Sequence, residues 1–250
     1  MNQVRPYSAL AQVYDLVMAH VDYEGWADYL VHLVEMHFED ADQPEVLELG
    51  AGSGLLTEEL LELVEWRITI SDGSADMLAA AGNRLGNRVQ QGKVIDFGRS
   101  WAGSLDREFD LIFLLYDGFN YLLEAESARQ LFEGVSARLA PGGLFLFDQS
   151  TPWNSINNEA FFEDEGEEHG LKYRRTSAYD REAAIHTTTF DIQTRAGRFH
   201  EEHQQRAWTR AEALAMVGEH DLEVVAAYDG FSLDPAHDES ERIHWVIRRR

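Results

Sequence analysis

From residue 45 onward, short apolar runs alternate with amphipathic stretches of helical period. The runs are VLELG, WRITI, a weaker RVQQGKV, FDLIFLL and LFLFD, and between them lie GLLTEELLELVE, SADMLAAAGNRL and residues 125–139. Strands that alternate with helices of about 10 to 15 residues predict βαβ units and a parallel sheet covered on both faces. This part of the chain is therefore expected to form a doubly wound α/β core.

The pattern changes at residue 150 and resumes at residue 208. An acidic run precedes three polar, alternating segments, LKYRRTSAYD, AAIHTTTFDIQT and GRFHEEHQQRAW. Turn residues at 194–197 separate the last two, which predicts an antiparallel β-meander inserted as a lid. After it, Thr209 is placed to cap a helix that runs to about Glu219. LEVVAAY and RIHWVIRR predict two closing strands, the last antiparallel.

Two helices are expected before the core. Ser8 is placed to cap a helix whose apolar residues recur at helical spacing, namely Leu10, Val13, Tyr14 and Val17. Residues 26–36 indicate a second helix. The predicted organisation is an N-terminal cover at 1–40, a core at 41–149 and 208–250, and an inserted lid at 150–207.

Composition narrows the classes of function. Hydrophobic residues make up 44% of the 250-residue chain, enough for a packed core, and the absence of cysteine excludes a disulfide framework, a thiol nucleophile and a Cys-ligated metal site. The formal net charge of −24 repels phosphate backbones and anionic lipid. No apolar run approaches the roughly 18 residues of a membrane span, and the N-terminus lacks a secretory pattern. These features argue against nucleic-acid and membrane partners and favour a cytoplasmic protein.

The first strand-to-helix turn is the expected ligand cradle, because ligands of open α/β sheets lie beyond the carboxyl ends of the strands. Its glycines are at 50, 52 and 54, but Leu55 stands where G-x-G-x-x-G requires glycine, and no Walker loop is present. Glu48 would repel a pyrophosphate but suits a cationic group. Asp72, which ends the second strand, can accept both hydroxyls of a ribose. A cationic amino-acid group beside a ribose describes S-adenosylmethionine.

At these residues the chain resembles the class I S-adenosylmethionine-dependent methyltransferases. VLELGAGSGLLT, ISDGSADML, FDLIFLLYDGFNYLL and LAPGGLFLFD are similar to four motifs of that family, in the family's order and spacing. YSALAQVYDLVM and ESERIHWVIRR further resemble a bacterial small-methyltransferase subgroup with a β-meander before the last two core strands. The resemblance implies a Rossmann-like, seven-stranded sheet, mostly parallel with an antiparallel last strand, and the product S-adenosylhomocysteine.

The resemblance also implies which residues contact the cofactor. Gly50, Ala51 and Gly52 would line its methionine portion, and Glu48 would orient the loop or the ammonium group. Asp72 would hold the ribose. The remaining implied contacts lie at the adenine, at the fourth strand and on the covering helix: Gly73, Met77, Val94, Ile95, Leu115 and Tyr14.

One position departs from the family's pattern. Where many relatives end the third strand with an acid that bonds the adenine amino group, this chain has Lys93, which cannot accept that bond. Two alternatives are open: Asp96 takes the role through a shifted turn, or the backbone at Val94 and Ile95 does so alone.

Substrate contacts are sought where the methyl group should emerge, at Tyr116, Asp117 and Asn120 after the fourth strand, and at His200 of the lid. Tyr116, Asp117 and His200 are candidate bases, but no residue is assigned as catalytic, because methyl transfer mainly requires alignment. His200 and His203 lie three apart on a strand and so point to opposite faces, which argues against a metal site. Basic lid residues would either bind an anionic substrate group or balance the acidic run: Lys172, Arg174 and Arg175.

The sequence therefore predicts methyl transfer from S-adenosylmethionine to N or O of a small molecule. Methylation of RNA or protein is an alternative, although the charge of −24 opposes RNA. A non-catalytic cofactor-binding module, with the lid strands as a homodimer interface, is another. The acceptor, the methylated atom and the oligomeric state are not readable from the sequence.

Overall fold

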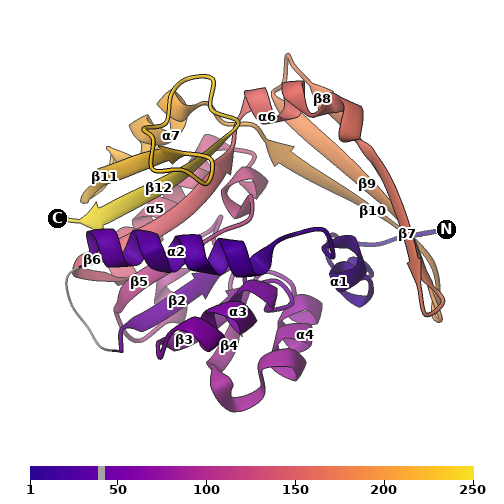
Figure 1. Cartoon of the computed structure of the whole chain (residues 1–250), viewed down its shortest axis with the longest axis horizontal. Helices are drawn as coiled ribbons and strands as arrows, with labels where there is room; N and C mark the ends of the chain where they lie inside the picture. The colour runs from indigo at the N-terminus through magenta and orange to yellow at the C-terminus, as the bar shows by residue number, and fades with distance from the viewer. Residues whose placement is uncertain (39–42) are drawn as a thin grey trace.

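The computed structural model describes residues 1–38 and 43–250 and contains two β-sheets (Figure 1). The larger has the strand order β11-β12-β6-β5-β2-β3-β4. Its strands are β2 (Glu45–Leu49), β3 (Arg67–Asp72), β4 (Gln90–Val94), β5 (Phe109–Leu114), β6 (Leu139–Ser150), β11 (Leu222–Asp229) and β12 (Arg242–Arg249). Neighbours from β4 to β6 are parallel, whereas β12 is antiparallel to β6 and β11. The predicted Rossmann-like, mostly parallel sheet with an antiparallel last strand is confirmed.

Helices cover both faces of this sheet. On one face pack α2 (Tyr23–His37), α3 (Leu55–Leu63) and α4 (Ala75–Leu85), and on the other α5 (Ala125–Arg138) and α7 (Arg210–Val217). Figure 1 shows α2 crossing in front of the sheet. Successive β5 residues serve the two faces, Leu111 and Phe113 on the α2 side and Ile112 and Leu114 on the α5 side. Burial on both faces explains why these strands are continuous apolar runs.

The smaller sheet has the order β1-β10-β9-β8-β7 and stands at one side of the core (Figure 1). Its strands are β1 (Asn2–Gln3), β7 (Glu163–Glu168), β8 (Leu171–Asp180), β9 (Ile185–Thr194) and β10 (Gly197–Arg206). The acidic run, for which no strand was predicted, forms β7. It pairs antiparallel with β8, where Lys172 Nζ lies 2.5 Å from Glu167 Oε2. Cross-strand charge pairing thus makes a strand of a segment whose own pattern is only acidic.

The N-terminal segment differs from its prediction. The helix expected after Ser8 is divided into η1 (Leu10–Gln12) and α1 (Tyr14–Val17), and the Ser8 hydroxyl donates to the Arg5 carbonyl instead of capping. A side chain from the smaller sheet takes the capping place, because Glu201 of β10 accepts from the amides of Ala9 and Leu10. By contrast, the predicted cap of α7 is confirmed: Thr209 and Glu212 form a capping box, and the helix ends at Val217.

Apolar side chains join the N-terminal segment to the smaller sheet. Leu10, Val13 and Val17 pack with Phe190 and Ile192. The short elements η2 (Gly86–Arg88), η3 (Ala102–Ser104), η4 (Gly118–Tyr121), α6 (Pro152–Asn157) and η5 (Glu159–Phe161) complete the fold. The predicted boundary between 40 and 41 lies outside the described residues. Within the described ranges, no helix has the length and apolar character that crossing a membrane requires.

Candidate active site

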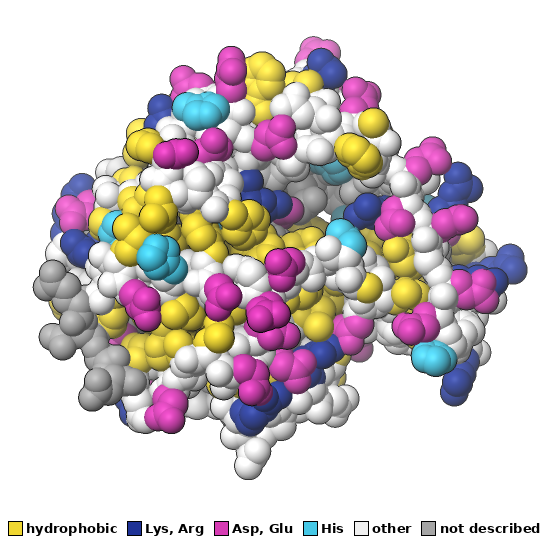
Figure 2. All heavy atoms as spheres, in the orientation of Figure 1, with side chains coloured by type: hydrophobic (Ala, Val, Ile, Leu, Met, Phe, Trp, Pro, Cys, Tyr) yellow, Lys and Arg dark blue, Asp and Glu magenta, His cyan; other side chains and the backbone are white. Residues whose placement is uncertain are grey.

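Two cavities adjoin beyond the carboxyl ends of the core strands. The cofactor cavity, named for its predicted ligand, has a volume of about 550 Å³ and follows the glycine loop and the ends of β3 and β4. The acceptor cavity, of about 270 Å³, lies between the core and the smaller sheet, where Figure 2 shows the molecule hollowed. Both are lined by Tyr7, Tyr14, Tyr116 and Tyr121. Ligands in the two cavities would therefore meet at one wall of tyrosines.

The glycine loop between β2 and α3 is held in a left-handed conformation. Gly50, Gly52 and Gly54 have φ of +67°, +59° and +81°, values that other residues adopt only with strain. The amide of Ala51 donates to the Ser71 carbonyl over 2.9 Å, which ties the loop to β3. Without side chains at 50 and 52, the loop backbone stands open to a ligand.

Asp72 connects this loop to the start of α4. Its Oδ2 accepts from the Gly52 amide (2.9 Å) and its Oδ1 from the Ser74 amide (2.7 Å). Burial raises the pKa of Asp72, and these two hydrogen bonds oppose the shift. A carboxylate has about four acceptor sites, so it can accept two more hydrogen bonds from a ligand.

Glu48 is a buried acid beside the loop, with 4% of its surface exposed. Thr57 donates to its Oε2 over 2.5 Å. Burial raises the pKa of Glu48 to about 7, and the nearby Asp72 adds to the rise, while the Thr57 bond opposes it. Within residues 1–38 and 43–250, no basic side chain forms an ion pair with Glu48. It lines a small extension of the site together with Ala51. A cationic ligand would supply the missing counter-charge.

The N-terminal cover is joined to the loop through Asp15 of α1. Ser53 donates to Asp15 Oδ1 over 3.0 Å, and Arg84 donates to the Ser53 carbonyl over 2.9 Å while it pairs with Asp15 and Glu58. These contacts place Tyr14 over the loop, where it lines both cavities.

The predicted adenine contacts gather at the far end of the cofactor cavity. Lys93 is not among the residues that line this cavity, and its Nζ donates to the Ser104 carbonyl. The amide of Ile95 donates to the Asp72 carbonyl. Asp96 lines the cavity, and its carboxylate pairs with Arg99 and accepts from the Gly98 amide. Other predicted residues that line it are Gly73, Met77, Val94, Ile95 and Leu115.

Tyr116 and Asp117 begin the floor of the acceptor cavity in strained conformations, with φ of +60° and +63°. The Asp117 amide donates to both oxygens of the fully buried Asp148, at 3.1 and 3.2 Å. Arg242 pairs with both carboxylates, 2.7 Å from Asp117 Oδ1. Asp117, predicted as a substrate contact or base, is thus held as a structural ion pair. Burial also raises the pKa of Tyr116, to about 12, so its hydroxyl keeps its proton at neutral pH.

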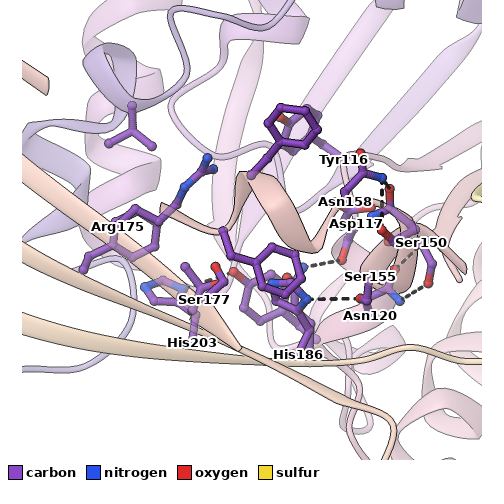
Figure 3. Close-up of a pocket in the computed structure, with 18 of the residues that line it drawn as sticks. Tyr116, Asp117, Asn120, Ser150, Ser155, Asn158, Arg175, Ser177, His186 and His203 are labelled. Atoms are coloured by element: carbon purple, nitrogen blue, oxygen red, sulfur yellow. Dashed lines mark hydrogen bonds between the residues drawn. The ribbon is translucent and has the colours of Figure 1, made fainter. Parts of the chain in front are cut away.

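Asn120 lines the cavity, but its amide group is already bonded. Its Nδ2 donates to the carbonyls of Ser150 and Arg206, both at 2.7 Å, and its Oδ1 accepts from the Ser150 amide (Figure 3). Three hydrogen bonds therefore make it a brace between η4, β6 and β10, and its role as a substrate contact stays a prediction.

His200 does not line either cavity. Its Nδ1 lies 2.7 Å from Asp191 Oδ1 on the outer side of the sheet. His203, three residues along β10, lines the acceptor cavity instead, as the alternation of strand side chains requires. Sequence reasoning missed His203 as a site residue, although its spacing of two from Glu201 places both on one face.

The opposite wall of the acceptor cavity comes from β8 and β9. Figure 3 shows Arg175 and Ser177 near His203, across the cavity from Asn120 and Ser150. Arg175 also lies 3.6 Å from Asp164. Over the described residues, no cluster of three or more potential metal ligands is found. The cavity is lined by apolar side chains of the N-terminal segment, η5 and β9 together with polar groups, most of which are neutral.

Comparison with known proteins identifies the core. Residues 46–143 match a family described as "Methyltransferase domain". YqeM of Bacillus subtilis (strain 168), which carries a provisional methyltransferase name, is 25% identical over 250 residues, covering 97% of each chain.

Solved structures share the fold over nearly the whole chain. An S-adenosylmethionine-dependent methyltransferase from Clostridium acetobutylicum ATCC 824 superposes with a TM-score of 0.78, at 24% identity over 97% of this chain and 98% of that chain. CalS10 of Micromonospora echinaspora, an amino pentose methyltransferase, superposes with a TM-score of 0.70, at 20% identity over 96% of this chain and 97% of that chain. Residues 46–143 thus match a methyltransferase domain, and the chain shares its fold with S-adenosylmethionine-dependent methyltransferases, the class that its sequence resembles.

Proposed function

We propose that the enzyme transfers the methyl group of S-adenosylmethionine to N or O of a small polar molecule bound in the acceptor cavity. The tyrosine wall shared by the two cavities is the observation that carries this proposal. It would bring a methyl donor on one side within reach of a nucleophile on the other. The smaller sheet then serves as the lid of residues 150–207.

The cofactor is assigned from the groups around each part of its cavity. Glu48, for which no basic partner is found among the described residues, would accept from the ammonium group, beside Gly50, Ala51 and Gly52. The free acceptor sites of Asp72 would take the ribose hydroxyls. Asp96, which lines the adenine end, would accept from the adenine amino group through its carboxylate; the backbone carbonyls at Val94 and Ile95 are the alternative acceptors, because the Ile95 N–H can only donate.

The bound cofactor supplies an electrophilic methyl group on a sulfonium. The protein's part is to align donor and nucleophile and to exclude water, which accounts for much of the rate of such in-line displacements. The strained turn at Tyr116, fixed by the Asp117–Arg242 pair, keeps the tyrosine wall rigid at the point of transfer. Tyr14 on the cover would close over the cofactor.

A small acceptor is favoured by the size and lining of its cavity. Its volume of about 270 Å³ is slightly below the usual range for drug-sized ligands, and its polar lining includes Arg175, Asn154 and Asn158. The amino sugar named for CalS10 is of this size and polarity. The net charge of −24 opposes RNA, and a cytoplasmic location fits a small metabolite as acceptor.

Calorimetric titration with S-adenosylmethionine, S-adenosylhomocysteine and NAD tests the cofactor. The first two should bind and NAD should not. An acceptor screen with labelled S-adenosylmethionine then tests transfer, using amino sugars, aliphatic amines and phenols. Cofactor binding with no transfer to any of them would favour the non-catalytic binding module, and light scattering would test the homodimer.

A further inference from the structure

A buried chain of hydrogen bonds runs from the smaller sheet to the tyrosine wall. Glu201 and His203 lie on one face of β10, and both are buried. His203 Nε2 lies 3.1 Å from Glu201 Oε2, and its Nδ1 lies 3.0 Å from the Tyr121 hydroxyl. The Tyr7 hydroxyl donates to that of Tyr121 over 2.6 Å. These four side chains connect the interior of the lid to both cavities.

The surroundings of Glu201 determine which nitrogen of His203 carries the proton. Its Oε1 accepts from the amides of Ala9 (2.6 Å) and Leu10 (2.9 Å), and its Oε2 from the Tyr7 amide (2.8 Å). Burial by itself raises the pKa of Glu201, but the bonds from His203 and these amides outweigh it and lower the value. An ionised carboxylate only accepts hydrogen bonds, so His203 Nε2 must donate. In the neutral ring, Nδ1 is then free to accept from Tyr121.

The direction of donation leaves an acceptor position at the cavity. Tyr121 donates to His203, and Tyr7 donates to Tyr121, so the Tyr7 oxygen retains lone pairs for a donor. Burial raises the pKa of Tyr7 and of Tyr121, which keeps both hydroxyls protonated. All three side chains line the acceptor cavity. A nucleophile there that donates to Tyr7 would enter the chain at its open end.

Building on the proposed function, we propose that His203 takes the proton that the acceptor loses on methylation, and that Tyr7 and Tyr121 pass it on. The acceptor's lone pair bonds to the methyl carbon, the carbon–sulfur bond breaks, and its electrons go to sulfur. The N–H or O–H proton of the acceptor moves to Tyr7, the Tyr7 proton to Tyr121, and the Tyr121 proton to His203 Nδ1. Glu201 stabilises the imidazolium that forms.

The first test is the protonation of His203, which requires no acceptor. Nitrogen NMR of the full chain with isotopically labelled histidine, assigned with His203→Gln, should find Nε2 protonated and Nδ1 unprotonated at neutral pH. A protonated Nδ1 would overturn the proposal, because that nitrogen could not accept from Tyr121.

The second test is methyl transfer to two probes, glucosamine as an amine and catechol as a hydroxyl compound. His203→Gln can still donate to Glu201 but cannot take a proton, so kcat should fall about 100-fold or more at unchanged affinity for S-adenosylmethionine. The Tyr121→Phe variant interrupts the chain of hydrogen bonds, and its kcat should fall by a similar factor. His169→Gln, exposed at the turn between β7 and β8, should match the wild type.

Wild-type kcat in His203→Gln would overturn the proposal. A wild-type enzyme that binds the cofactor but methylates neither probe would count against the acceptor class of the proposed function instead. In that case, the NMR measurement of which His203 nitrogen carries the proton is the test that decides this inference.

Discussion

The cofactor cavity and the acceptor cavity are assembled from the chain in different ways. Most of the cofactor cavity is formed by the turns that directly follow β2, β3, β4 and β5, whose carboxyl ends meet at one edge of the sheet. The acceptor cavity combines the N-terminal segment, η4, α6 and three strands of the smaller sheet. Sheet topology alone thus brings the first set together, whereas the second requires packing between distant segments.

The two cavities also differ in their charges. The cofactor side has two buried acids, Glu48 and Asp72, for which no ion pair with a basic side chain is found in the described part of the chain. On the acceptor side, Asp117 is paired with Arg242, and Glu201 is surrounded by donors. Under the proposed function, one side would receive a cation, and the other a neutral polar molecule that loses a proton.

The largest effect is expected from Asp72→Ala, which tests whether the cofactor side depends on a single carboxylate. Its removal takes away two ligand acceptor sites and releases the amides of Gly52 and Ser74. Affinity for S-adenosylmethionine, measured by calorimetry, should fall about 100-fold, or about 2.8 kcal/mol. Asp106→Ala, at an exposed position, is the control. Unchanged affinity in a folded Asp72→Ala protein would contradict the ribose assignment.

Glu201→Gln tests whether the N-terminal cover is anchored to the smaller sheet. The Glu201 carboxylate accepts four hydrogen bonds, from three backbone amides and from His203. In the Gln variant, the side-chain NH2 group is a donor and would face these buried donors. The free energy of unfolding, from urea titration, should fall by about 2 kcal/mol, and the Ala9 and Leu10 amides should exchange faster. The control is Glu202→Gln, at the next residue of β10 on the exposed face. This variant should change the free energy of unfolding by less than about 0.5 kcal/mol. Equal stability of the two variants would place the anchor elsewhere.

Glu48 gives the cofactor side a pH dependence. Its pKa is raised from 4.5 to about 7, so the folded free protein keeps a proton that the unfolded chain releases, and it loses stability as pH rises through this window. A cationic ligand favours the ionised form, so calorimetric affinity for S-adenosylmethionine should increase about fivefold from pH 6 to pH 7. Glu48→Gln should remove most of this slope. A wild-type affinity that does not change with pH would show that Glu48 does not face the ammonium group.

The smallest effect is expected from Asp15→Asn, at the link between the cover and the glycine loop. Asp15 is 58% exposed in its pair with Arg84, which also pairs with Glu58. Exposed pairs contribute little, so thermal unfolding should indicate a loss below about 0.5 kcal/mol. A loss as large as that of Glu201→Gln would mean that the core, rather than the smaller sheet, anchors the cover.

Local pattern predicted most of the core because each element there carries its own signal. The apolar runs of β2, β3 and β5 and the capping box at Thr209 agree with the final structure. Prediction failed where another segment completes the hydrogen bonds. Ser8 does not cap a helix because Glu201 binds the amides that follow it, and β7 forms because β8 supplies basic partners for an acidic run.

The sequence by itself indicated the resemblance to methyltransferases, the core topology and the positions of the glycine loop, Glu48 and Asp72, because these depend on short contiguous motifs and on the rule that parallel strands end together. Tertiary structure alone decided that Asp117 pairs with Arg242 and that Tyr7, Tyr121 and His203 meet. Those contacts join residues far apart in the chain, and no local periodicity encodes them. Tertiary structure also decided that His203, and not His200, faces the acceptor cavity. Only the packing of β10 against the core determines which face of that strand turns inward.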